Sequence, residues 1–113
     1  MAVDNEISCI EARDWANSRD DLIMFDMRTE ENRSDYELPG FTPGNEDEIT
    51  SKLPELSLRK TILLICDDGK KSKKMQKIIQ ACSLKSYIVR GGFNEWREVI
   101  NPKIKRNFWE KKI

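Results

Sequence analysis

Cys66 is the residue best placed for chemistry, because it stands between an apolar run and a polar loop. The apolar run covers residues 61–65, and the loop, residues 67–71, leads into a helical pattern. A cysteine there lies at the C-terminal edge of a strand, which is where open α/β sheets bind ligands. The helix that follows turns its unpaired N–H groups and its positive dipole end toward the loop. This position favours the chemistry of a stabilised thiolate.

The residues after Cys66 could hold an anion beside the sulfur. Backbone amides that curl around one point can bind an anion, and Gly69 supplies a position that accepts positive φ or a close approach of the backbone. Lys70 and Lys71 add positive charge. We therefore expect an anion-binding loop made of the following residues: Asp67, Asp68, Gly69, Lys70, Lys71 and Ser72.

Length and composition predict one domain that binds neither nucleic acid nor a membrane. The chain has 113 residues with 20 basic and 20 acidic side chains, so its net charge gives no overall attraction for nucleic acid. The longest apolar stretch is too short to span a bilayer, and the first residues lack the pattern of a signal peptide. We expect a cytoplasmic protein with a domain over residues 1–100 and a tail over residues 101–113.

The cysteines do not have the pattern of a disulfide framework or a metal site. Cys9, Cys66 and Cys82 are odd in number and widely spaced, and the chain has no C-x-x-C pair. The absence of histidine excludes a Cys/His zinc site and a Cys-His nucleophile pair, and we expect no metal and no cofactor. Activation of Cys66 must then come from lysines, amides and the helix end. Cys9, in a first helical turn, and Cys82, on an apolar helical stripe, are interpreted as structural.

Short apolar runs that alternate with helical stripes predict the elements around the loop. A capping box of the S-x-x-E form starts at Ser8, and continuous apolar runs suit the buried strands of a parallel sheet. The predicted helices cover residues 9–18, 70–82 and about 93–100, with a short helix within 46–56, and the predicted strands cover residues 22–25, 63–65 and 87–89. Residues 28–44 are expected to be irregular. The alternation implies a parallel sheet covered by helices on both faces.

Four motifs in order resemble those of the rhodanese domain, the sulfurtransferase family, over about residues 6–100. Asp26-Met27-Arg28 resembles the D-x-R motif, and Leu38-Pro39-Gly40 resembles the last part of the H-I-P-G motif. Cys66 to Lys71 resembles the C-x-x-G-x-R loop, and Gly91 to Trp96 resembles the G-G-x-x-x-W motif. The resemblance implies an α/β fold with a roughly five-stranded parallel sheet flanked by helices. It also implies a sulfurtransferase, in which Cys66 takes up a sulfane sulfur as a persulfide and passes it on.

The resemblance implies small-molecule partners. These are a sulfur donor, such as thiosulfate, a polysulfide or a low-molecular-weight persulfide, and a thiol or cyanide-like acceptor. Asp67 stands where thiosulfate-using members often carry arginine, Glu37 replaces the histidine of H-I-P-G, and Lys71 stands where many members have arginine. Because Asp67 and Asp68 oppose an anionic donor, we expect thiosulfate to be a poor one.

The functional interpretations have alternatives. Asp26 and Arg28 either support the pocket or pair with their neighbours, and the pairing role is favoured. A catalytically weak rhodanese-like module that binds a protein partner is the alternative to sulfur transfer, and Asp67 and Asp68 favour it. A tyrosine or dual-specificity phosphatase is excluded, because Ser72 occupies the position where the arginine of such an enzyme would stand.

The C-terminal tail is basic and carries aromatic residues. Phe108 and Trp109 lie among charged residues of which all but one are basic: Lys103, Lys105, Arg106, Glu110, Lys111 and Lys112. A tail of this kind either docks on a protein partner, or packs back on the domain or stays partly disordered.

Overall fold

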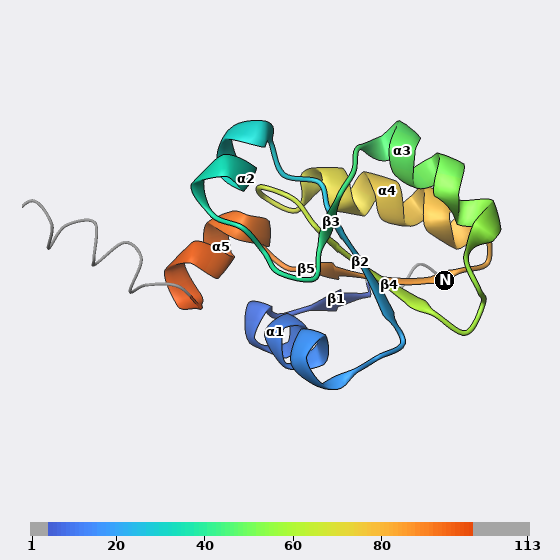
Figure 1. The fold of residues 1–113 in the computed structure, drawn as a ribbon, viewed down its shortest axis with the longest axis horizontal. Helices are drawn as coiled ribbons and strands as arrows, with labels where there is room; N and C mark the ends of the chain where they lie inside the picture. The colour runs from blue at the N-terminus through green and yellow to red at the C-terminus, as the bar shows by residue number, and fades with distance from the viewer. Residues whose placement is uncertain (1–4, 101–113) are drawn as a thin grey trace, which may run out of the picture.

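Five parallel strands form one sheet in the order β1-β5-β4-β2-β3, with helices on both faces (Figure 1). The computed structural model describes residues 5–100, and the tail discussed above lies outside them. The strands are β1 (Glu6–Ile7), β2 (Leu22–Asp26), β3 (Thr42–Pro43), β4 (Thr61–Ile65) and β5 (Lys85–Val89). The helices are α1 (Cys9–Ser18), α2 (Glu30–Asp35), α3 (Glu46–Lys52), α4 (Lys70–Ala81) and α5 (Gly92–Val99), with a 3-10 turn, η1 (Leu53–Glu55), after α3. The predicted α/β fold with a five-stranded parallel sheet is confirmed.

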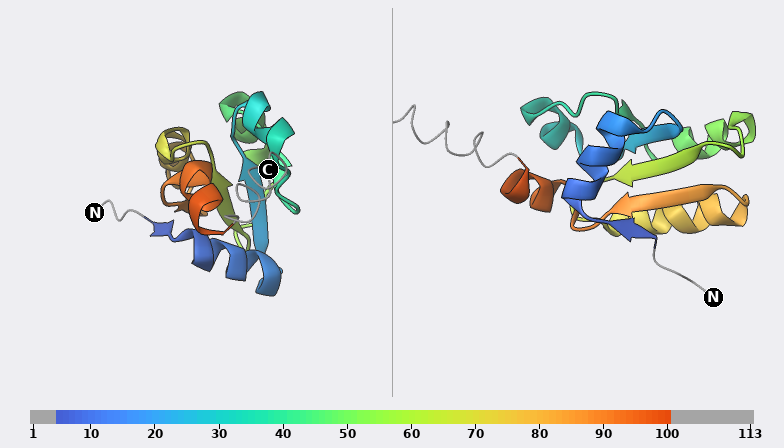
Figure 2. Two further views of the ribbon diagram at one scale, coloured as in Figure 1. Left: turned by 90° about the vertical axis from the view of Figure 1, so that its left-hand side faces the viewer. Right: turned by 90° about the horizontal axis from the view of Figure 1, so that it is seen from below.

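β4 is the centre of the sheet and sets the position of Cys66. It pairs with β2 on one side and β5 on the other, and all of its residues are buried. Figure 2 shows β4 and β5 running in the same direction. Side chains along a strand alternate between the two faces. Ile62, Leu64 and then Cys66 belong to the buried cluster beneath α3 and α4, whereas Leu63 and Ile65 belong to the cluster beneath α1 and α5.

Capping boxes set the starts of two helices. At α1, Ser8 Oγ accepts the N–H of Glu11 at 3.1 Å, and Glu11 Oε1 accepts the N–H of Ser8 at 3.2 Å. Asn45 and Glu48 form the same reciprocal arrangement at α3. Such boxes satisfy N–H groups that have no partner inside the helix. The predicted helix over residues 9–18 is confirmed, and the predicted short helix within 46–56 is present as α3 and η1. None of the helices within residues 5–100 is long and apolar enough to cross a bilayer.

The sequence pattern does not predict β1, β3 or α2. β1 and β3 have two residues each, which is too few to show a period. α2 lies within the stretch expected to be irregular, and none of its residues is buried, so it has no apolar stripe. Its start depends instead on Thr29, whose Oγ1 accepts the N–H of Asn32 at 3.3 Å.

The buried residues of α4 do not include Cys82, which the sequence pattern places on an apolar stripe. The buried residues are spaced at i, i+3, i+4 and i+7: Ser72, Met75, Gln76 and Ile79. Gln76 is satisfied because its Nε2 donates to the carbonyl oxygens of Asn5 and Ser86, at 3.0 and 3.1 Å. Cys82 is exposed, so its interpretation as a residue of the apolar stripe is wrong. The helix ends at Ala81, and the chain turns at Ser83, with φ of 62°, before β5.

Candidate active site

Cys66 lies at the start of the loop between β4 and α4, with its sulfur facing two backbone amides. Its Sγ accepts the N–H groups of Gly69 at 3.1 Å and Ser72 at 3.4 Å. The side chain has no exposed surface. Gly69 is the N-cap of α4 and has φ of 94°, a conformation that is costly for residues with a side chain. This turn lets the chain reverse between the cysteine and the helix.

Only part of the predicted anion-binding loop faces the sulfur. The N–H of Lys70 donates to Asp68 Oδ1 at 3.0 Å, and both of these residues are exposed. Gly69 and Ser72 therefore supply the amide donors to Sγ. The Ser72 side chain is also buried, and its hydroxyl has no hydrogen-bond partner among the residues that the structure describes. That hydroxyl is free to bond a group held at this point.

The Asp67 side chain bonds α2 rather than the thiol. Its carboxylate accepts the backbone N–H of Thr29 at 3.2 Å and a side-chain N–H of Asn32. Thr29 is the N-cap of α2, so the carboxylate lies at the positive end of that helix. The sequence gives no sign of this contact, because the partners lie 38 and 35 positions away along the chain. Asp67 therefore ties the Cys66 loop to α2.

The first turn of α5 holds the same loop from another side. The N–H of Phe93 donates to the carbonyl oxygen of Cys66 at 2.8 Å, and the N–H of Asn94 donates to that of Asp67 at 3.0 Å. Gly92 makes this approach possible, because a Cβ there would overlap the Cys66 carbonyl oxygen. The sequence predicts a turn at Gly91 and Gly92 but does not reveal that it packs against the cysteine loop.

Asp26 and Arg28 form a buried ion pair where β2 ends. Arg28 Nη2 lies 2.7 Å from Asp26 Oδ2, and Arg28 Nε lies 2.9 Å from Oδ1. The exposed fractions of the two side chains are 1% for Arg28 and 4% for Asp26. The guanidinium also stacks on Phe93, with Cζ 4.4 Å from the ring centroid. Charge-assisted bonds of this kind fix geometry as well as adding energy, which agrees with the pairing role favoured from the sequence.

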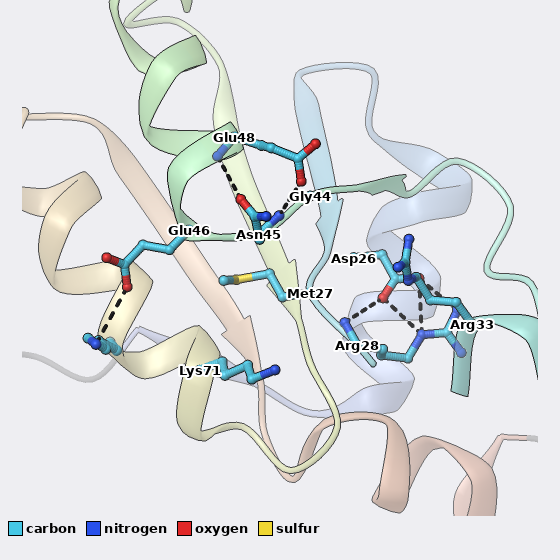
Figure 3. Close-up of a pocket in the computed structure, with 10 residues that line it drawn as sticks. Asp26, Met27, Arg28, Arg33, Gly44, Asn45, Glu46, Glu48 and Lys71 are labelled. Carbon is cyan, nitrogen blue, oxygen red and sulfur yellow. Dashed lines mark hydrogen bonds and ion pairs between the residues drawn. The ribbon is translucent and has the colours of Figure 1, made fainter. Parts of the chain in front are cut away.

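A cavity of about 360 Å³ opens beside this pair (Figure 3). The end of β2, the start of α3 and the first turns of α4 contribute to its walls. Lys71 lines it, whereas Lys70 and Cys66 do not. Met27 also lines it, and the Met27 side chain belongs to the buried cluster that contains Cys66. The N–H of Met27 donates to the carbonyl oxygen of Ile65 at 2.7 Å, so this wall of the cavity is bonded to the residue before the thiol.

The other cysteines have different surroundings. Cys9 is buried, and its Sγ lies 3.7 Å from Glu95 Oε2. Burial, followed by the charge of Glu95, raises the pKa of Cys9 to about 11, so the thiol is protonated at neutral pH. Cys82 is exposed, and neither residue has an arrangement of amides like that at Cys66. Within residues 5–100, no three side chains of the types that bind metals gather into a metal site.

Comparisons with known proteins agree with this fold. The model of the family described as "Rhodanese-like domain" matches residues 11–99. A rhodanese-like domain protein from Staphylococcus aureus has a TM-score of 0.71 at 21% identity, with 81% of this chain and 90% of that chain covered. A rhodanese-related protein from Thermoplasma volcanium has a TM-score of 0.70 at 18% identity, with 83% and 91% covered. The reduced CoADR-RHD protein of Bacillus anthracis has a TM-score of 0.70 at 20% identity, with 82% of this chain but 16% of that chain covered.

These levels of identity show a shared fold and do not by themselves show a shared activity. The search of curated proteins found no match.

Proposed function

The chain belongs to the rhodanese-like domain family, and on that premise we propose that it is a sulfurtransferase or persulfide carrier with Cys66 as its nucleophile. The observation that carries the proposal is the pair of amides, from Gly69 and Ser72, that donate to Sγ. Hydrogen bonds to the charged form of a group stabilise that form, and the N-terminus of α4 adds a positive dipole end. The family includes sulfurtransferases, and their chemistry needs a stabilised sulfur anion.

In the first step, Cys66 takes a sulfur atom from a donor. The thiolate attacks the outer sulfur of a persulfide, R–S–SH. A bond forms between Sγ and that sulfur, and the S–S bond of the donor breaks. The electron pair of the broken bond leaves with the donor as R–S⁻, and Cys66 then carries –S–SH. Thiosulfate reacts in the same way and releases sulfite.

In the second step, an acceptor removes the outer sulfur. A thiolate R′–S⁻ attacks it and becomes R′–S–SH, while the electron pair of the Cys66 persulfide bond returns to Sγ. Cyanide takes the sulfur in the same way and becomes thiocyanate. Between the two steps, we assign the Ser72 hydroxyl a hydrogen bond to the outer sulfur. A buried hydroxyl without a partner is costly, and the persulfide would supply that partner.

A donor reaches Cys66 only when a neighbouring side chain moves, because the thiol has no exposed surface. Met27 is the side chain that we assign to this movement. It lines the cavity, is 6% exposed and shares a buried cluster with Cys66. Methionine is unbranched and rearranges easily within a core. The cavity is therefore our proposed route to the thiol.

A transfer assay tests the proposal. Because Cys82 is exposed and could take up sulfur unspecifically, the assay uses Cys82→Ser protein. Thiocyanate formation from cyanide, and sulfide release by a thiol, are followed with thiosulfate, polysulfide or glutathione persulfide as donor. We expect Cys82→Ser protein to turn over the persulfide. The double variant, which also carries Cys66→Ala, should show no turnover above the uncatalysed rate. Equal turnover with and without the Cys66 thiol would overturn the proposal.

The second candidate is a rhodanese-like module that binds a protein partner and catalyses weakly. The complete burial of Cys66 favours it, since a thiol without exposed surface reacts slowly. Its partner could dock on the basic tail, residues 101–113, which lies outside the described residues. Cys66→Ala separates the two functions, because binding of a partner survives that change and sulfur transfer does not.

We also propose a cytoplasmic location and small-molecule partners, a sulfur donor and a thiol acceptor. All three cysteines are free, which suits a reducing compartment. The proposal includes no nucleic acid and no membrane partner.

A further inference from the structure

The cavity beside the Cys66 loop is lined by acidic residues that are already engaged. Asp26 is held in the buried pair with Arg28. Glu46 Oε1 lies 3.7 Å from Lys74 Nζ. Glu48 closes the capping box at the start of α3. Positive side chains elsewhere on the wall are therefore left without a neutralising carboxylate.

Arg33 and Lys71 are these positive side chains, and they reach the cavity from α2 and α4 (Figure 3). Neither forms an ion pair with a residue that the structure describes. The Nε of Arg33 is buried, and it donates to no acceptor within residues 5–100. A buried N–H group of this kind calls for an explanation, and an acceptor brought by a ligand would provide one.

We propose that the cavity binds the carboxylate of an organic persulfide, with Arg33 and Lys71 as anchors, and that this compound is the sulfur donor. The inference deepens the proposed function and rests on it. Guanidinium and ammonium groups both form charge-assisted hydrogen bonds with carboxylates, and arginine can do so through two parallel bonds. A volume of about 360 Å³ lies within the range of sites for small organic ligands and exceeds what an inorganic sulfur anion fills.

Glu46, at the start of α3, suits an ammonium group on the same ligand. Glu46 is paired with Lys74, whose side chain is 77% exposed, and surface pairs of this kind are weak. A ligand ammonium can therefore replace Lys74 beside Glu46. An amino-acid-like persulfide has a carboxylate for Arg33 and Lys71 and an ammonium for Glu46. Thiosulfate has only negative charge, so it matches the two anchors but not Glu46.

The anchors also bring the ligand close to the reacting thiol. Lys71 precedes Ser72, whose amide donates to Cys66 Sγ, in the first turn of α4. Met27 lies on the cavity wall and in the cluster that contains Cys66. A persulfide whose carboxylate is held by Arg33 and Lys71 would thus approach the thiol past Met27, the route proposed above.

The first test measures binding without any sulfur transfer. S-methylglutathione is an unreactive thioether with carboxylates and an ammonium, and its diethyl ester lacks the carboxylate charges; both are titrated by NMR. We expect the acid to bind at least about tenfold more tightly than the ester, and Arg33→Met or Lys71→Met to weaken binding of the acid about tenfold. Arg33→Lys should restore part of the loss, since it keeps the charge.

The matched control is Lys77→Met, which removes an exposed charge from α4 outside the cavity and should leave binding unchanged. Thermal unfolding of each variant verifies that it is folded. Equal affinity for the acid and the ester, or unchanged affinity in folded Arg33→Met, would overturn the inference.

The second test separates this site from sulfur transfer itself. Loading of Cys66 is measured with glutathione persulfide and with 2-hydroxyethyl persulfide, whose organic part carries neither a carboxylate nor an ammonium. We expect Arg33→Met to raise KM for glutathione persulfide about tenfold, while kcat for this donor and the rate with 2-hydroxyethyl persulfide stay the same. If glutathione persulfide and 2-hydroxyethyl persulfide load Cys66 equally well, both in the parent protein and in Arg33→Met, Arg33 does not anchor the donor. That result would overturn the anchoring role and leave sulfur transfer intact. No loading by either donor, with S-methylglutathione still bound through Arg33, would overturn the proposed function and the assignment of the ligand as donor.

Discussion

Replacement of Gly92 by alanine tests the contact that holds the Cys66 loop against α5. A Cβ at this position would overlap the carbonyl oxygen of Cys66 and lie 2.9 Å from the carbonyl carbon and oxygen of Asp67. These are backbone atoms, which cannot rotate aside as the end of a side chain can. The loop that carries the thiol must therefore shift.

The expected loss of stability has two parts. A residue with a side chain at φ of 62° costs about 1 to 2 kcal/mol relative to glycine. The shift also breaks the hydrogen bond between the Phe93 N–H and the Cys66 carbonyl, which contributes about 1 kcal/mol. We expect the free energy of unfolding to fall by about 2 to 3 kcal/mol. Sulfur loading of Cys66 should slow about 100-fold, as for reacting groups misplaced by about 1 Å.

Gly40→Ala is the matched control for Gly92→Ala. Gly40 also has positive φ, 88°, but the atom nearest to a Cβ there is Cε of Met24, the end of a flexible side chain that can move aside. Urea unfolding and the rate of persulfide formation compare the two variants. We expect Gly40→Ala to lose only the conformational part, about 1 to 2 kcal/mol, and to keep its loading rate. A Gly92→Ala protein that is as stable and as fast as Gly40→Ala would refute this reasoning.

Three other changes test the surroundings of the site. Asp67→Asn removes the charge from the hydrogen bonds that tie the loop to α2, and urea unfolding should show a loss of about 1 kcal/mol; no loss would argue against that tie. Asp26→Ala leaves Arg28 buried without its counter-ion and should destabilise the protein by about 3 to 5 kcal/mol in the same assay, whereas a loss below about 1 kcal/mol would mean that the pair behaves as a surface pair. Burial raises the pKa of Cys9 to about 11, so the folded protein keeps a proton that the unfolded chain releases near pH 8.5. Stability should therefore fall as the pH rises from about 8.5 to 11, and Cys9→Ala should flatten this decline; an unchanged slope would show that another group causes it.

The elements that the sequence predicts are those with local signals. The apolar run that became β4 is buried throughout, and the capping box at Ser8 marks the start of α1. β1 and β3 are short edge strands, and their pairing with β5 and β2 depends on residues far away in the chain. The prediction for Cys82 failed because apolar spacing alone does not show where a helix ends, and α4 ends one residue earlier.

The candidate site also has parts with a local sequence signal and parts that depend on residues far away in the chain. A strand end, a glycine and a helix start follow one another in the sequence, so Cys66 and its amide cradle could be anticipated. The partners of Asp67 could not, because α2 meets the loop only through the fold. Gly92 contacts the Cys66 loop because β4 and β5 are neighbours in the sheet. Arg33 carries no sequence signal, since it lies in a helix without an apolar stripe.

Mass spectrometry of the intact protein tests most directly whether Cys66 carries sulfur. Cys82→Ser protein is exposed briefly to thiosulfate, polysulfide or glutathione persulfide, and its mass is measured before and after addition of cyanide. If sulfur is transferred through Cys66, the protein gains the mass of one sulfur atom, and cyanide removes it. The double variant that also carries Cys66→Ala shows no such gain. No gain with any donor, or a gain that persists without the Cys66 thiol, would contradict it.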